Sequence, residues 1–77
     1  MKTNLNLSDR ERQVLTLLAT GNSTLSTASA LGISAETVKT HRKNILLKLG
    51  AKNIAHATSI GINNEIISTK FDIAKVP

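Results

Sequence analysis

Apolar residues recur at helical spacing in four segments of this 77-residue chain. Within each segment leucine, isoleucine, valine or alanine lies three or four positions from the next, as on one face of an α-helix. Glycine or short polar residues separate the segments and can end one helix and begin the next. We therefore predict an all-α fold, a compact domain of four helices at about residues 9–20, 23–31, 35–49 and 53–66.

Side chains that cap helices stand at the predicted starts. Ser8 and Glu11 have the spacing of a capping box, in which each side chain accepts a hydrogen bond from the backbone amide of the other residue. Ser23, Ser34 and Asn53 hold the capping positions of the three later helices. The pattern and the caps thus predict the same helix starts.

The last ten residues show no sustained period. We predict one domain over residues 1–67, followed by a C-terminal tail at 68–77. The chain has no cysteine, which excludes disulfides and zinc-thiolate sites and suits a reducing cytoplasm. Its apolar runs are far shorter than the roughly 20 residues that span a bilayer, so we expect a soluble cytoplasmic protein without a membrane partner.

Positive charge is concentrated on the third predicted helix. The formal charge is +5, and half of the ten lysines and arginines lie within residues 39–52, a stretch without acidic residues. A basic helix face of this kind favours a polyanionic partner. Phe71 is the only aromatic residue, which argues against binders that stack single-stranded bases. Duplex DNA is therefore the expected partner, although basic residues also merely solvate many exposed helix faces.

The second and third predicted helices have the spacing of a helix-turn-helix. Ala28 permits a close crossing, Gly32 permits a left-handed turn, and the β-branched Val38 packs the third helix against the second. A pair of helices joined by glycine can also be a plain packing unit. The charge placement favours the DNA-binding interpretation.

A helix in the major groove reads bases with long donors from its first turns, while nearby cations and hydroxyls contact phosphates. The base-contact candidates, on the face opposite the apolar residues, are Lys39, Thr40 and Lys43. The phosphate-contact candidates are Ser23, Thr24, Ser34, Thr37, Arg42, Lys48 and Lys52.

The fourth predicted helix carries a strip of small or apolar residues. The candidates for a dimer interface are Ile54, Ala57, Thr58, Ile60 and Gly61. Some of them must pack on the other helices, but a chain this small has little other surface for a two-fold contact. A homodimer is therefore expected.

The runs LSDRERQVLTLLATGNS (7–23) and LGISAETVKTHRKNILLKLGAKN (31–53) resemble the LuxR-type helix-turn-helix domain of quorum-sensing and two-component regulators, and the resemblance covers about residues 7–67. The resemblance implies a four-helix fold with its third helix in the major groove and dimerisation through its fourth helix. It also implies base contacts by Lys39, Thr40 and Lys43 and a phosphate contact by Thr37.

The chain departs from this family at three positions. Leu25 replaces a usual lysine, Thr27 replaces a usual buried isoleucine, and Ile54 replaces a usual arginine. A buried hydroxyl without an acceptor costs about 1–3 kcal/mol, so we expect the second helix to be shifted, loosened or partly rescued by Leu25. Ile54 enlarges an apolar patch that a partner can cover.

We therefore expect a sequence-specific regulator of transcription that binds a pseudo-palindromic DNA site as a dimer. No phosphoacceptor or ligand-binding domain is expected, so the chain is either part of a larger regulator or controlled by its amount and its partners. The rival is a small interaction protein that forms a heterodimer through the fourth helix with a full-length regulator and antagonises it. A basic helix on an anionic membrane is disfavoured, because aromatic anchors are missing.

Catalytic and cofactor chemistry finds no support in the sequence. His41 and His56 are the only imidazoles, and their spacing is not that of a helical metal site. The four glycines form no phosphate loop, and no nucleophile elbow or carboxylate pair is present. We expect no enzyme, no cofactor, no metal and no small-molecule ligand.

Overall fold

The computed structural model describes residues 6–67, a part of the chain that contains four α-helices and no strands. The helices are α1 (Asp9–Ala19), α2 (Thr24–Leu31), α3 (Ala35–Leu49) and α4 (Ile54–Asn63). The all-α prediction is confirmed, and α1, α2 and α3 begin and end within one residue of their predicted bounds. No described helix combines the length and apolarity that a membrane span requires. The predicted tail at 68–77 lies outside the described residues.

Each helix begins at a side chain that accepts a hydrogen bond from the backbone of its first turn. Ser8 Oγ accepts from the Glu11 amide at 3.1 Å, and Glu11 Oε1 accepts from the Ser8 amide at 2.9 Å, so the predicted capping box is confirmed. Ser34 Oγ accepts from an amide of the first turn of α3 at 3.0 Å. Ser23 and Asn53 cap α2 and α4 in the same way. Local chemistry therefore determines where the helices start.

Gly32 provides the tight turn between α2 and α3. Its backbone is left-handed, with φ 68° and ψ 33°, a conformation that costs glycine little and residues with a Cβ more. The amide of Ile33 donates to the carbonyl of Ala28 at 3.0 Å and satisfies one of the last carbonyls of α2. The chain then enters α3 at Ser34. The helix-turn-helix predicted from the sequence is present.

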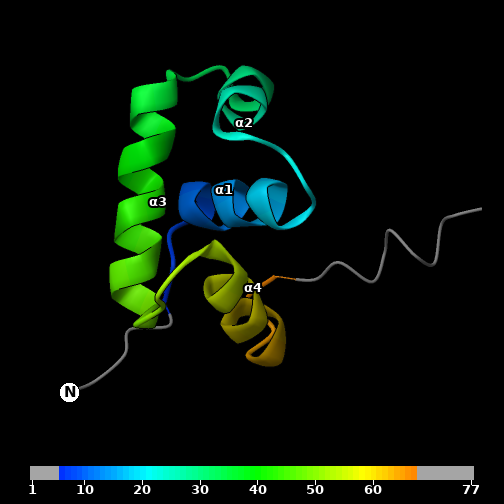
Figure 1. The fold of residues 1–77 in the computed structure, drawn as a ribbon, viewed down its shortest axis with the longest axis vertical. Helices are drawn as coiled ribbons and strands as arrows, with labels where there is room; N and C mark the ends of the chain where they lie inside the picture. Colours follow the sequence, from blue (N-terminus) through cyan, green and yellow to red (C-terminus); the bar gives the residue numbers. More distant parts are fainter. Residues whose placement is uncertain (1–5, 68–77) are drawn as a thin grey trace, which may run out of the picture.

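Helix α1 lies between α2 and α4, and α3 runs alongside all three (Figure 1). The centre of the core consists of Val14 and Leu15 of α1 with Val38, Ile45 and Leu49 of α3, all of which are fully or almost fully buried. Because these three α3 residues share one face, the other faces of α3 remain open to solvent.

Helix α2 buries a threonine hydroxyl, as the sequence predicted, without a hydrogen-bond partner in the described part of the chain, and Leu25 does not compensate for it. Thr27 is completely buried, and its Oγ1 has no hydrogen-bond partner within residues 6–67. Leu25 does not fill the core near it, since 73% of its surface is exposed. Of the three expected outcomes for α2, a shift, a loosening or a partial rescue by Leu25, the rescue is wrong, because the Leu25 side chain projects outward from the first turn of α2.

Helix α4 ends three residues earlier than predicted. Glu65 adopts a positive φ of 58°, which breaks the helix, and the amides of Ile66 and Ile67 both donate to the carbonyl of Gly61 at 2.7 and 3.2 Å. This turn directs Ile67 back into the core, where it is 6% exposed. The predicted helix over 53–66 is thus corrected to Ile54–Asn63.

Candidate nucleic-acid interface

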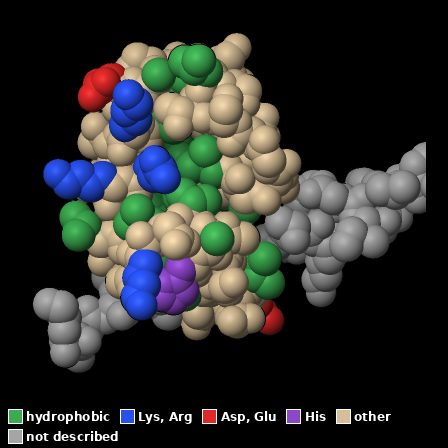
Figure 2. All heavy atoms as spheres, viewed as in Figure 1, with side chains coloured by type: hydrophobic (Ala, Val, Ile, Leu, Met, Phe, Trp, Pro, Cys, Tyr) green, Lys and Arg blue, Asp and Glu red, His purple; other side chains and the backbone are tan. Residues whose placement is uncertain are grey.

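The exposed side of α3 carries the positive charge of the domain. Lys39, Thr40, Arg42 and Lys43 are all exposed, whereas Val38 beside them is completely buried. Figure 2 shows lysine and arginine side chains gathered along the side of the molecule where α3 lies. This surface has the charge and the helical shape that a duplex major groove accepts.

The three predicted base-contact residues lie close together on this surface. Lys39 and Lys43 are four positions apart and therefore neighbours on one ridge of the helix. Neither ammonium group forms an ion pair within the described part of the chain. Thr40 donates from Oγ1 to the carbonyl of Glu36 at 3.2 Å, which leaves its oxygen able to accept a hydrogen bond. The ridge thus presents two cationic donors and one oriented acceptor.

The predicted hydroxyl contacts gather at two helix starts. Ser34 Oγ and Thr37 Oγ1 lie 2.9 Å apart at the N-terminus of α3. Ser23 and Thr24 stand at the N-terminus of α2, an eight-residue helix about 12 Å long whose other end leads into the turn before Ser34. Helix N-termini attract anions through their unpaired amides and the helix dipole. The two helix starts are therefore two separate places where phosphates can be held.

Lys48 forms an ion pair within the domain. Its Nζ donates to Oε1 of Glu11 at 2.7 Å, and this carboxylate is only 5% exposed. An ammonium that neutralises a buried acid is not available as a free counter-charge for phosphate. Lys48 therefore joins α3 to α1, a role that the sequence did not predict, and its ion pair with Glu11 competes with the predicted phosphate contact.

The surroundings of Glu11 determine its ionisation. Burial opposes the charged form and raises its pKa, but hydrogen bonds from Lys48 and from the amide of Ser8, with the positive charge of Lys48, outweigh burial. The net effect lowers the pKa of Glu11 below its ordinary value of 4.5. At neutral pH Glu11 is therefore an anion, and its pairing with Lys48 is complete.

The remaining predicted phosphate contacts, Arg42 and Lys52, are exposed. The amide of Lys52 donates to Nδ1 of His56 at 3.1 Å, so the loop between α3 and α4 is held to the first turn of α4. This contact leaves the ammonium group of Lys52 unengaged by the histidine. Both cations are positioned to meet a polyanion that lies along α3.

The predicted dimer residues of α4 divide into two groups. Ala57 and Gly61 are buried within the monomer, and Gly61 lies against Leu15 of α1 and Ile67 of the turn after α4. Ile54 and Ile60 are half-buried and pack on the core, and Thr58 is half-buried at the edge. Ala57 and Gly61 are therefore unavailable for a contact between two copies, which corrects the prediction for these two residues.

Two leucines to which the sequence assigned no role lie beside the basic ridge of Lys39 and Lys43. Leu46 is half-buried and packs against the core. Leu47 was assigned no role, yet 69% of its surface is exposed. Both border a shallow hollow with Ala51 and the cations of α3. The position of Leu47, four residues after Lys43, is the sequence signal that places it on the same ridge.

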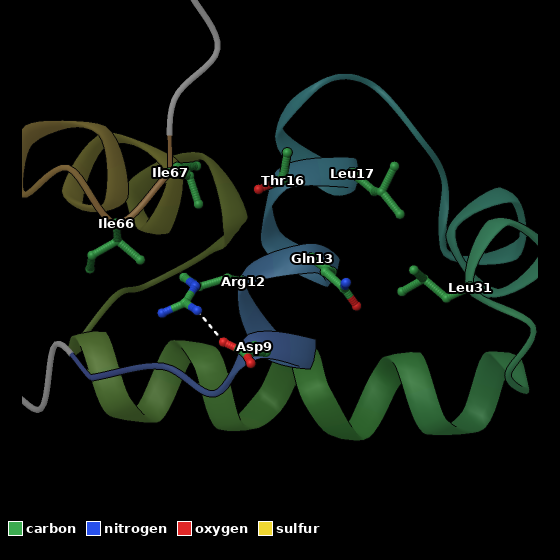
Figure 3. Close-up of a pocket in the computed structure, with 8 residues that line it drawn as sticks. All are labelled: Asp9, Arg12, Gln13, Thr16, Leu17, Leu31, Ile66 and Ile67. Carbon is green, nitrogen blue, oxygen red and sulfur yellow. Dashed lines mark hydrogen bonds and ion pairs between the residues drawn. The ribbon is translucent and has the colours of Figure 1, made fainter.

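A second hollow lies on α1, between the end of α2 and the turn after α4 (Figure 3). Its apolar lining comes from Leu17, Leu31 and the two isoleucines of that turn. The two charged residues of its lining, Asp9 and Arg12, form an ion pair with each other. The charges of this hollow therefore satisfy one another, unlike those along α3.

Comparisons with known proteins support the interpretation of this geometry. Residues 5–61 match the family described as "Bacterial regulatory proteins, luxR family". The chain is 39% identical over 62 residues to the transcriptional regulatory protein MctR of Rhizobium johnstonii. This alignment covers 80% of this chain and 29% of MctR. The chain is also 41% identical over 56 residues to the transcriptional regulatory protein FixJ of Rhizobium meliloti. This alignment covers 73% of this chain and 28% of FixJ.

A similar fold occurs among solved structures. Phage VqmA, in its complex with DPO, matches with a TM-score of 0.75 at 29% sequence identity, over 90% of this chain and 32% of that chain. The present chain thus spans less than a third of the length of MctR, FixJ or VqmA.

Proposed function

This chain belongs to the luxR family of bacterial regulatory proteins, and we propose that it regulates transcription by binding a specific sequence in duplex DNA with α3 in the major groove. One observation carries the proposal. The exposed side of α3 bears Lys39, Arg42 and Lys43 with no acid after Glu36, while its opposite face forms the core. The cations are thereby fixed on a rigid helix, as base recognition requires.

The exposed groups divide between reading bases and holding the backbone. Lys39, Thr40 and Lys43 reach base edges, because they project from the outer ridge of the first three turns of α3. The remaining polar groups at the helix starts and along α3 fix the position of the domain on the duplex without reading its sequence. These phosphate contacts are Ser23, Thr24, Ser34, Thr37, Arg42 and Lys52.

The DNA-bound form is a homodimer on a pseudo-palindromic site, with half-sites about one helical turn apart. The contact between copies uses the outer face of α4. That face presents Ala55, Ser59 and Ile62 as exposed residues, with Thr58 at its edge. Ile62 is the largest apolar group of this strip and is 42% exposed. A small apolar strip of this kind suits a two-fold pair that becomes stable only when DNA holds both copies.

Selection from a pool of random duplexes tests the proposal. The chain is mixed with the pool, the tightest binders are recovered, and their affinities are measured by fluorescence anisotropy at several salt concentrations. We expect enrichment of a palindrome bound well above random duplexes, and its half-site spacing reports the dimer geometry. Weak binding that depends only on salt, with no enriched sequence, would contradict the proposal.

The exposed Leu25 favours a second candidate function. An apolar side chain, 73% exposed, occupies the first turn of α2 next to the proposed phosphate contacts of Ser23 and Thr24. This weakens the attraction of α2 for DNA and suits a protein that pairs through α4 with a full-length regulator and antagonises it. The Leu25→Lys substitution separates the two functions. It should strengthen DNA binding of a regulator, whereas it leaves the pairing of an antagonist unchanged.

A further inference from the structure

We propose that Leu47 determines part of the DNA specificity by contacting the C5-methyl group of a thymine in the major groove. The inference rests on the proposed function and assigns the chemistry of one further contact. It concerns a leucine that is 69% exposed on the most basic surface of the domain, where solvent gives an apolar side chain no partner.

Leu47 lies on the same ridge of α3 as Lys39 and Lys43. It lies four residues after Lys43 and eight after Lys39, so the three side chains follow one ridge of α3. With Leu46 and Ala51 it lines a hollow whose rim carries Lys39, Arg42 and Lys43. A ligand that binds these cations therefore also lies against Leu47.

The base edges of the major groove offer few apolar groups that Leu47 could contact. The cations select a polyanion, and a duplex that receives α3 presents mainly hydrogen-bonding groups in its major groove. The C5-methyl of thymine is the apolar group of that edge. Burial of the exposed leucine against any other part of the base edge would desolvate polar atoms without replacing their hydrogen bonds. Thymine is therefore the base that Leu47 accommodates.

Distances along the helix limit where this thymine lies. One turn of α-helix advances about 5.4 Å, so Leu47 stands about 6 Å along α3 from Lys43. Stacked bases are about 3.4 Å apart along each strand. The thymine should therefore lie within about two base pairs of the base that Lys43 contacts, toward the end of the site that faces the C-terminus of α3.

Replacement of thymine by deoxyuridine tests this contact, because deoxyuridine lacks only the methyl group. Each thymine of the selected duplex is replaced in turn, and dissociation constants are measured for the full chain, for Leu47→Ala, for Leu47→Met and for Leu25→Ala. Leu25 is the matched control, since it is an exposed leucine on a different helix. Circular dichroism melts of all four proteins report whether their fold is intact.

For the unaltered chain we expect one replacement to weaken binding about three- to fivefold, the effect of losing one buried methyl. Leu47→Ala should weaken binding to the thymine duplex by a similar factor and be insensitive to deoxyuridine at that position. Leu47→Met should retain part of the response, and Leu25→Ala should retain all of it.

Two results would overturn the inference. One is that no deoxyuridine replacement weakens binding by the unaltered chain. The other is that Leu47→Ala keeps the full response, which would assign the methyl to another residue. Failure of the proposed function is distinguishable from these two results, because it appears earlier, when the selection enriches no DNA sequence. In that case the Leu47 contact is overturned as well.

Discussion

Lys48 of α3 neutralises Glu11 of α1 across 37 positions of sequence, with 2.7 Å between Nζ and Oε1. The same Oε1 also accepts from the amide of Ser8 at 2.9 Å. One buried carboxylate oxygen therefore caps α1 and ties α1 to α3. The orientation of α3 relative to the rest of the domain depends in part on this contact.

Loss of Lys48 should destabilise the fold more than it weakens DNA binding. Lys48→Met keeps the apolar stem but leaves Glu11 buried without its cation, and we expect a loss of about 1–3 kcal/mol in the free energy of unfolding. Urea denaturation measures this loss. Lys52→Met is the matched control and should change the stability by less than about 0.5 kcal/mol. Equal effects of the two substitutions would show that the ion pair contributes nothing.

Stability should fall in acid because the pKa of Glu11 is lowered by folding. The unfolded chain binds a proton near the ordinary value of 4.5, and the folded chain binds it only at lower pH. The contribution of Glu11 is therefore complete above that value and is lost as pH falls through the folded pKa. Urea denaturation between pH 7 and pH 3 should show a steeper decline for the unaltered chain than for Glu11→Gln. Parallel declines would assign the acid sensitivity to other groups.

Removal of the unpaired hydroxyl in α2 should stabilise the domain. Thr27→Val keeps the shape of the side chain and deletes Oγ1, which lacks a partner within the described residues. We expect a gain of about 1–2 kcal/mol, measured by thermal or urea unfolding. Thr40→Val is the control on an exposed site, where the loss of its bond to Glu36 should give no gain. A destabilised Thr27→Val would mean that the hydroxyl has a partner in solution.

Gly61 should tolerate no large side chain, for a reason internal to the monomer. A Cβ at this position would lie 3.1 Å from Ile67 Cγ1 and 3.3 Å from Leu15 Cδ2. Gly61→Leu should therefore lower the free energy of unfolding by about 1–3 kcal/mol through overpacking. Ser59→Leu, on the exposed face of α4, is the control and should leave the folded monomer stable. If Gly61→Leu changed only the dimer dissociation constant, Gly61 would belong to an interface.

Lys43 and Lys52 should differ in the kind of DNA contact that they make. Lys43→Ala should relax the preference at one base pair by about 1–3 kcal/mol, because it removes a base contact. Lys52→Ala should weaken all duplexes alike and reduce the slope of log affinity against log salt by about one. Anisotropy titrations on the selected site and on single-base variants separate these effects. A uniform loss for both substitutions would contradict the division of roles.

Short-range signals in the sequence predicted the helices well. Ser8, Ser23, Ser34 and Asn53 cap the helices that they were expected to cap, because a cap depends on residues within one turn. The end of α4 was missed, since the apolar Ile66 continues the helical period. The break depends on the positive φ of Glu65, a residue type that carries no clear signal for that conformation.

Long-range relationships were less predictable. Lys48 looked like one more cation of the basic helix, because its acidic partner lies in α1 and not nearby in sequence. Ala57 and Gly61 looked suitable for a close contact between copies, but small residues permit close packing inside a monomer equally well. Which of these uses applies depends on the orientation of α4, which the spacing of small residues does not specify.

The turn at the end of α4 sets the shortest length at which this domain can be excised or fused. The match to the family ends at residue 61, yet Ile67 covers Leu15 and Gly61 from a point six residues later. A chain trimmed at Asn63 would carry every helix and every DNA-contact candidate, but its interior would be open on one side. Ile67 is the last buried side chain within residues 6–67, so tags and junctions should be placed no earlier than after this residue.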